Sequence, residues 1–391
     1  MSFAIQDTTA PTDLASLERF PPEILEIIVS SVSSLEALWD LLRASPNCWR
    51  VFAIRYASIT ETVLSGPHST TPVSVSKLIR AVALVRARNF PFANLRGFRK
   101  DFLVHITRHD IQNRYFLNAG PCTIFGPNSL PNSRDVITSV VATAYHISAL
   151  AQSLLSSWLQ RLERSSFTRF PPDPEPIPEY EVEFLHGMGQ PTYIEEMRAV
   201  RALWIIQLVG EVKAMVRSRP NIVRWSNVDS SLLSRLNTVS ILPYRGYGNS
   251  VEVEVYVMVK HLPACYKNDT VFRLPQAPAP SQYNRWATMH PRATMAQLED
   301  RECRLDDASY ARFLIADRYS KIFDLPPRLG FPFWDYSRMC SLGLTSPTTC
   351  RYPGYFGWAP RPILPNSSTS TLNRSLKPPS QQGGTTTVMV F

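Results

Sequence analysis

The chain has 391 residues and a formal net charge of +9, from 41 basic and 32 acidic side chains, and 44% of its residues are hydrophobic. A chain of this length and composition can bury a sizeable core. No apolar run approaches the roughly 18 residues of a membrane-spanning helix, and the basic side chains are scattered rather than clustered. We therefore expect neither a membrane nor a nucleic acid as partner.

The six cysteines lie far apart and form no Cys-x-x-Cys pair, and the first residues do not have the pattern of a secretory signal. This usage indicates free thiols in a reducing compartment. The sequence therefore predicts a cytoplasmic or nuclear protein.

Near the N-terminus, residues 17–56 predict three short helices in close succession. The first begins at Pro21–Pro22, because a proline in the first turn removes no intrahelical hydrogen bond. Ser33 and Glu36 have the spacing of a capping box for the second helix. Ser45, followed by a proline, is a typical start for the third.

These helices carry more apolar surface than three short helices can bury among themselves. Trp39 and Leu41 in particular are left over when the apolar stripes are paired. The surplus could dock a partner protein, or it could pack on the rest of the chain. The apolar pattern leaves both interpretations open.

Longer helices are predicted further along the chain at 74–88, at 134–164 and from Thr192 to Arg217. Thr192 and Glu195 have the spacing of a capping box at the start of the last of these. Within this helix we expect Trp204 to lie in the core and Arg201 to form an internal ion pair or to bind a carbonyl group.

Other stretches have weaker or mixed patterns. Residues 251–262 alternate valine with glutamate like a strand, yet their apolar positions also share a helical face. The stretch 295–323 has a helix-like pattern, while the five prolines of 170–179 predict a stiff loop. The polar residues 1–15 and the Pro-, Ser- and Thr-rich residues 359–391 are predicted to be disordered.

Patterns typical of enzymes and metal sites are weak. Asp101, His105 and His109 would align on a helix, but the stretch lacks the glutamate of a His-Glu-x-x-His zinc site. Glu252 and Glu254 are interpreted as a solvated face rather than a pair of catalytic carboxylates. We therefore predict no catalytic residue, no metal and no cofactor, and expect that the protein is not an enzyme.

The N-terminal segment resembles an F-box. The residues that carry the resemblance are Leu17-x-x-Phe20-Pro21-x-Glu23-Ile24-Leu25-x-x-Ile28-x-x-x-Val32, Leu38, Leu42, Ala44-Ser45-Pro46 and Trp49. The ending of this motif is similar to that of F-box proteins of filamentous fungi. Two later stretches look like the same group. The first is Glu196-x-Arg198-x-x-Arg201-Ala202-Leu203-Trp204-x-x-Gln207-Leu208, mainly through Arg201-Ala202-Leu203-Trp204, and the second is Arg328-x-Gly330-Phe331-x-Phe333-Trp334-Asp335-x-x-Arg338 with Gly343-Leu344. In the second, Trp334 is interpreted as a packed aromatic and Asp335 as a turn carboxylate.

The resemblance implies a protein-docking function. An F-box binds the Skp adaptor of a Skp–cullin–F-box ubiquitin ligase, and through it a cullin, while the rest of the chain presents a protein substrate. The alternative is a scaffold that uses the adaptor outside a cullin ligase. The expected adaptor-binding residues, acting directly or by shaping the three helices, are Leu17, Phe20, Pro21, Pro22, Ile24, Leu25, Ile28, Val32, Leu35, Leu38, Leu42 and Trp49.

The predicted fold is mainly α. It comprises an F-box at 16–58, an irregular multi-helix domain at 59–358 and disordered termini. For 251–262 we choose a helix, because the corresponding stretch of the resembled group looks helical. The predicted F-box segment carries more acidic than basic side chains although the whole chain is basic, which favours protein docking over nucleic-acid binding.

Overall fold

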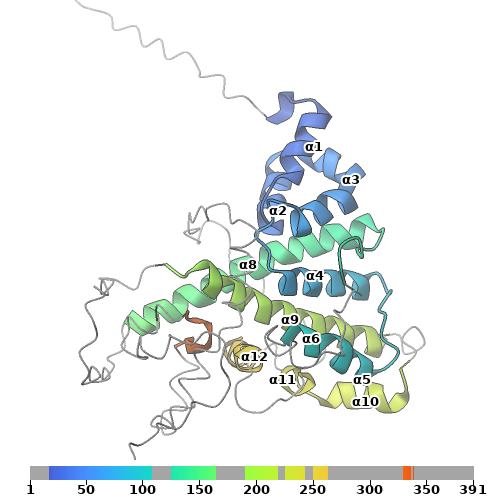
Figure 1. Ribbon diagram of the computed structural model, residues 1–391, viewed down its shortest axis with the longest axis vertical. Helices are drawn as coiled ribbons and strands as arrows, with labels where there is room; N and C mark the ends of the chain where they lie inside the picture. The colour runs from blue at the N-terminus through green and yellow to red at the C-terminus, as the bar shows by residue number, and fades with distance from the viewer. Residues whose placement is uncertain are drawn as a thin grey trace, which may run out of the picture. The chain divides into compact units, whose positions relative to one another are not determined.

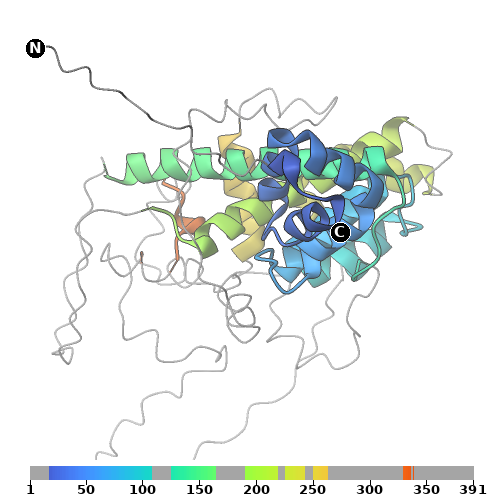
Figure 2. The same cartoon turned by 90° about the horizontal axis from the view of Figure 1, so that it is seen from above.

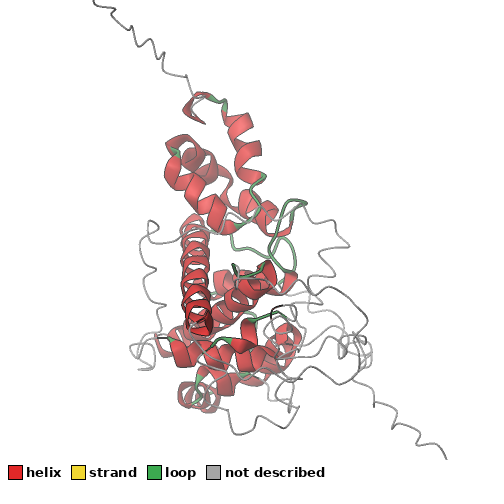
Figure 3. Ribbon diagram, turned by 90° about the vertical axis from the view of Figure 1, so that its left-hand side faces the viewer, coloured by secondary structure: helices red, strands yellow, loops and turns green. Residues whose placement is uncertain are grey.

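The structure is a computed structural model, and it describes residues 17–107, 125–163, 190–218, 225–242, 250–262, 329–335 and 338. All of these belong to the first of two compact units, Met1–Cys350; the second is Arg351–Phe391. The described residues are mainly helical and contain no strand, which confirms the predicted fold class (Figure 3). The stretches 1–15, 170–179, 295–323 and 359–391, for which we made predictions, lie outside the described residues.

Three helices form the N-terminal unit, as the sequence predicts. A 3-10 turn at Leu17–Arg19 (η1) precedes α1 (Pro22–Ser30), α2 (Leu35–Ala44) and α3 (Pro46–Ser65). Pro21 is the N-cap of α1, and Pro22 occupies its first turn. Ser45 caps α3, because its Oγ accepts a hydrogen bond from the backbone N of Cys48 at 3.1 Å.

The start of α2 differs from the prediction. The N-cap is Ser34, whose Oγ accepts from the backbone N of Ala37 at 3.4 Å, so the capping box of Ser33 with Glu36 is wrong. The carbonyl oxygen of Ser33 instead accepts bonds from the backbone N and the Oγ1 of Thr70, at 2.8 and 3.1 Å. Ser33 is thus engaged with the loop after α3.

Helix α3 continues beyond the predicted three-helix segment. It runs to Ser65 with a non-helical turn at Arg55, where φ is −115° and ψ is 21°. The boundary predicted between residues 58 and 59 therefore falls inside a helix. This helix contacts α1 and α2 in the N-terminal unit. It also contacts α4 and α8, which belong to the rest of the described chain, called the body below.

The helices of the body follow in chain order. They are α4 (Val73–Arg86), α5 (Leu95–Gly97), the π-helical turn η2 (Phe98–Leu103), α6 (Val104–Thr107), α8 (Arg134–Glu163), α9 (Tyr193–Ser218), α10 (Asn227–Arg235), α11 (Thr238–Ile241), α12 (Ser250–His261) and the 3-10 turn η6 (Phe331–Phe333). The helices predicted at 74–88, 134–164, 192–217 and 251–262 are confirmed as α4, α8, α9 and α12.

Helix α9 is the centre of the body. Every residue from Arg201 to Gly210 is buried, because α4, α8 and α12 all pack against this helix. The predicted capping box is present: the backbone N of Thr192 donates to Glu195 Oε2 at 2.8 Å, and the backbone N of Glu195 donates to Thr192 Oγ1 at 3.4 Å. Trp204 lies in the core, as predicted.

An ion pair joins α9 to α12. Arg201 Nη2 lies 3.0 Å from both carboxylate oxygens of Glu254, and both side chains are fully buried. The predicted internal pairing of Arg201 is confirmed, and the solvated position predicted for Glu254 is wrong. Glu254 is three residues after Val251 and four before Met258, so on a helix it lies on the buried face with them.

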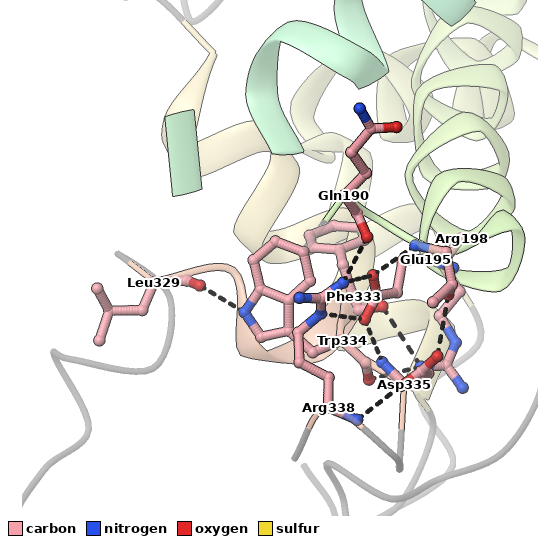
Figure 4. Close-up of polar contacts among 9 residues, drawn as sticks. Gln190, Glu195, Arg198, Leu329, Phe333, Trp334, Asp335 and Arg338 are labelled. Atoms are coloured by element: carbon pink, nitrogen blue, oxygen red, sulfur yellow. Dashed lines mark hydrogen bonds and ion pairs between the residues drawn. The ribbon is translucent and has the colours of Figure 1, made fainter. Parts of the chain in front are cut away.

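The segment around η6 packs on α8 and α9. Trp334 is buried, and its indole N–H donates to the carbonyl oxygen of Leu329 at 2.8 Å (Figure 4). Phe333 stacks on Trp158 of α8 with ring centroids 4.9 Å apart. Gly330 has a φ of 70°, and a Cβ there would lie 2.8 Å from the Trp158 ring. A glycine is therefore required for this close approach.

Polar contacts fix the same segment to the start of α9 (Figure 4). Arg338 binds Glu195 with two contacts, Nε to Oε1 at 2.7 Å and Nη2 to Oε2 at 2.9 Å. Asp335 accepts from the backbone N of Arg338 at 2.8 Å and from Thr192 Oγ1 at 3.0 Å. Arg198 donates to the carbonyl oxygen of Trp334 at 2.8 Å. The interpretation of Trp334 and Asp335 as a packed aromatic and a turn carboxylate is confirmed.

The N-terminal unit rests on α8. Helix α2 packs against α8, and α3 contacts both α8 and α4. The hydroxyl of Tyr56 donates to Asn132, just before α8 begins, and Figure 2 shows the unit lying over one end of this long helix. In Figure 1 the elements follow one another from α1 and α3 through α2 to α8, α4 and α9. Trp39 and Leu41 are half-buried against the core, so part of the apolar surplus packs on the chain itself.

Candidate protein-docking surface

The turn η1 is fastened to the start of α3. Ser45 Oγ donates to Glu18 Oε1 at 2.6 Å, and Asn47 Nδ2 donates to the carbonyl oxygen of Glu18 at 3.1 Å. The same serine hydroxyl accepts the capping bond of α3. These contacts fix where the chain enters α1, and they hold Phe20 at the surface with its ring partly exposed.

Helix α1 has an inner and an outer apolar face. Leu25 and Val29 are buried against the core of the unit. Ile24 and Ile27 remain 42% and 65% exposed. A 9-residue helix with isoleucines on its solvent side leaves apolar area in water that no contact of the described chain covers.

Helix α3 carries two further large side chains that are exposed. Trp49 is 39% exposed, with its ring edge-on to Trp39 at 6.2 Å and tilted against Phe52 at 6.1 Å. Ile54 is 77% exposed. The neighbouring residue Arg55 forms a long, exposed ion pair of 3.9 Å with Glu26 of α1. Trp49 is thus held in one orientation by two aromatic neighbours while part of its ring faces solvent.

Exposed apolar side chains are concentrated in this unit. Among the described residues, the large hydrophobic side chains that are exposed outside it are Val73, Val228, Leu232 and Tyr256, which are spread over α4, α10 and α12. Inside it they are Phe20, Ile24, Ile27, Trp49 and Ile54, which we call the outer apolar surface. Such a concentration within 35 residues is typical of a protein-binding surface.

The structure separates the predicted adaptor-binding residues into three groups. Phe20, Pro21, Pro22, Ile24 and Trp49 are exposed, and Leu17, Ile28 and Val32 are half-buried. Leu25, Leu35, Leu38 and Leu42 are buried in the core, where they shape the helices and offer no contact surface to a partner. The first group is available for direct contacts.

Sequence reasoning missed two residues of the outer apolar surface. Ile27 lies one turn from Ile24 on the same flank of α1, and this spacing could have identified it. Ile54 is not one of the motif residues and follows the last of them by five positions, so the motif carries no comparable signal for it. Both are more exposed than Phe20, Ile24 and Trp49.

Other kinds of site are not evident in the part of the chain that the structure describes. No group of three His, Cys, Asp or Glu side chains among those residues could hold a metal ion, and none of their helices is long and apolar enough to cross a membrane. Cys48 is a buried free thiol. His105 lies at the end of the described residues and His109 beyond them, so the aligned histidines fall largely outside the structure.

In comparisons with known proteins, no family model, curated protein or solved structure matches the chain.

Proposed function

We propose that the chain is the substrate-receptor (F-box) subunit of a Skp–cullin–F-box ubiquitin ligase, which binds the Skp adaptor through residues 17–56. The observation that carries the proposal is the outer apolar surface, which lies on the helices that bear the F-box-like motif. Its residues are exposed on a unit that also packs on α8 through α2 and α3. A partner that covers them removes apolar area from water, which stabilises the complex.

The rest of the protein would present the substrate. Helix α8 has 30 residues and contacts both the N-terminal unit and the central helix α9, so it couples the two parts. A firm connection of this kind raises the effective concentration of a bound substrate near the ligase without any bond chemistry in this chain. The protein would therefore act by proximity rather than as an enzyme.

The proposal is tested by purifying the full chain from cells in which the proteasome is blocked. Recovery of both a Skp adaptor and a cullin supports the proposal. Recovery of the adaptor without a cullin favours the alternative, a scaffold that works outside the ligase. Recovery of neither protein refutes both functions.

A variant separates specific from non-specific recovery. Ile27→Asp places a charge on the outer apolar surface, and Val228→Asp places one at a similarly exposed position of α10. The first should lose the adaptor, because the interface would have to bury an unpaired charge. The second should keep it.

A further inference from the structure

A small cavity lies where the N-terminal unit meets the body. Its volume is about 30 Å³, room for roughly two water molecules. Residues of α2, of the loop after α3, and of α4, α8 and α9 line it, among them Glu36, Thr70, Ser148 and Met197. The cavity therefore marks a joint at which several elements meet without filling the space.

Two carboxylates lie at this joint on different helices: Glu36 lines the cavity, and Glu196 directly precedes Met197, which also lines it. Glu196, in the first turn of α9, is buried, and its Oε1 accepts from Gln152 Nε2 of α8 at 3.3 Å. Ser148 of α8 is its second hydrogen-bond partner. Glu36 approaches from the first turn of α2 and repels Glu196 electrostatically. Burial, and then this repulsion, raise the pKa of Glu196 to about 7.

The arginines nearest to Glu196 in sequence on α9, and the arginine of α2, have other partners. Arg198 donates to the carbonyl oxygens of Phe333 and Trp334, and Arg43 of α2 lies over the Tyr145 ring. Other arginines pair with carboxylates: Arg80–Glu61, Arg86–Glu211, Arg201–Glu254 and Arg338–Glu195. On α8, burial lowers the pKa of His146, so this imidazole is neutral at pH 7 and supplies no positive charge. The charge that acts on Glu196 is therefore that of Glu36, and it repels an ionised Glu196.

The loop at Thr70 connects the two helix starts that carry these carboxylates. The backbone N of Thr70 donates to the carbonyl oxygen of Ser33, just before α2, at 2.8 Å. The carbonyl oxygen of Thr70 accepts a hydrogen bond from the hydroxyl of Tyr193, the first residue of α9. A movement of α2 away from α9 must break or stretch this chain of contacts.

We propose that this joint is a proton-operated switch. Protonated Glu196 keeps the start of α2 closed on the start of α9, and ionised Glu196 repels Glu36, draws water into the cavity and opens the contact. The N-terminal unit would then be held more loosely on the body at slightly alkaline than at slightly acidic pH. This inference does not depend on the proposed adaptor binding.

Amide hydrogen exchange of the full chain, followed by mass spectrometry, tests the switch. The peptides to follow contain the starts of α2 and α9 and the loop at Thr70. Because opening lets Glu196 release a proton that the closed joint retains, the opening constant should rise about tenfold per pH unit from about pH 5 to about pH 7 and then level off. Dividing each rate by that of the Glu196→Gln chain removes the intrinsic pH dependence of exchange.

Two variants decide the outcome. In Glu196→Gln the opening constant should not depend on pH, whereas in the control Glu211→Gln, on the same helix, the wild-type profile should remain. Glu36→Gln removes the repulsion, so its opening constant should level off at lower pH and at a smaller value. Equal pH profiles of the wild type and Glu196→Gln would overturn the proposal, and so would an unchanged profile in Glu36→Gln.

Discussion

Replacing Arg338 by methionine removes the partner of a fully buried carboxylate. Arg338 contacts both oxygens of Glu195, at 2.7 and 2.9 Å, and Glu195 has no solvent exposure. Removing one member of a buried pair costs about 3–5 kcal/mol, since the other charge stays buried without compensation. Glu195 keeps two backbone donors, Thr192 N at 2.8 Å and Asp335 N at 2.9 Å. We therefore expect Arg338→Met to lower the free energy of unfolding by about 3 kcal/mol, at the low end of that range.

This loss should depend on pH. Burial raises the pKa of Glu195 above the ordinary glutamate value of 4.5, and Arg338 opposes that rise, so Arg338→Met should raise the pKa further. The folded variant then keeps a proton that the unfolded chain releases, and its stability falls as the pH rises above 4.5. The cost of the substitution should thus be smaller near pH 5 than near pH 8.

Urea unfolding of both chains at the two pH values measures this effect. Arg55→Met is the matched control, because Arg55 forms an exposed ion pair of 3.9 Å with Glu26. The control should change stability by less than about 0.5 kcal/mol at either pH. A loss below about 1 kcal/mol for Arg338→Met, or equal losses at both pH values, would show that the contact with Glu195 does not hold the segment in place.

Three further substitutions probe the core. Gly330→Ala should destabilise by about 3 kcal/mol, because it strains a φ of 70° and drives a Cβ against the Trp158 ring at 2.8 Å; an unchanged melting temperature would contradict this. Trp204→Ala should cost about 3–5 kcal/mol in thermal unfolding, and a wild-type melt would mean that α9 is peripheral. Glu196→Gln should stabilise by about 3 kcal/mol above pH 7 and by almost nothing below pH 4.5, since the folded-state pKa of Glu196 is raised from 4.5 to about 7. Urea titrations across that range in which the wild type and Glu196→Gln remain equally stable would refute this estimate.

The main helices were predictable because each carries a long apolar stripe with clear start signals. The Thr192–Glu195 capping box placed the start of α9 within one residue. The second capping box failed because two serines precede α2, and the spacing alone chose Ser33. The chain instead uses Ser34 as the cap and turns Ser33 toward Thr70, 37 residues away, a contact that the local sequence does not reveal.

Burial was harder to predict than helicity. Glu254 was placed in solvent because glutamates alternate with valines there, although its spacing from Val251 and Met258 puts it on the buried face of a helix. The link between Glu195 and Arg338 spans 143 residues and has no local signature. Such long-range pairs depend on how helices pack, which periodicity does not specify.

The candidate docking surface was predicted in part. The motif identified Phe20, Ile24 and Trp49, which are exposed. It could not show that Leu25 of α1 is buried together with the α2 residues Leu35, Leu38 and Leu42. Nor could it show that Trp39 packs partly against the core. An apolar residue is expected inside by default, so the exposure of Ile27 and Ile54 is information that only the packing of α1 and α3 supplies.

The most direct test of the proposed function is a binding titration of the purified full chain with a purified Skp adaptor from a filamentous fungus. The account predicts a stable complex that Ile27→Asp weakens about thirtyfold or more, as expected for loss of a central contact of about 2 kcal/mol. Val228→Asp, at a 76% exposed position of α10, should bind like the wild type. Absence of binding by the wild type, or equal binding by Ile27→Asp, would contradict the account.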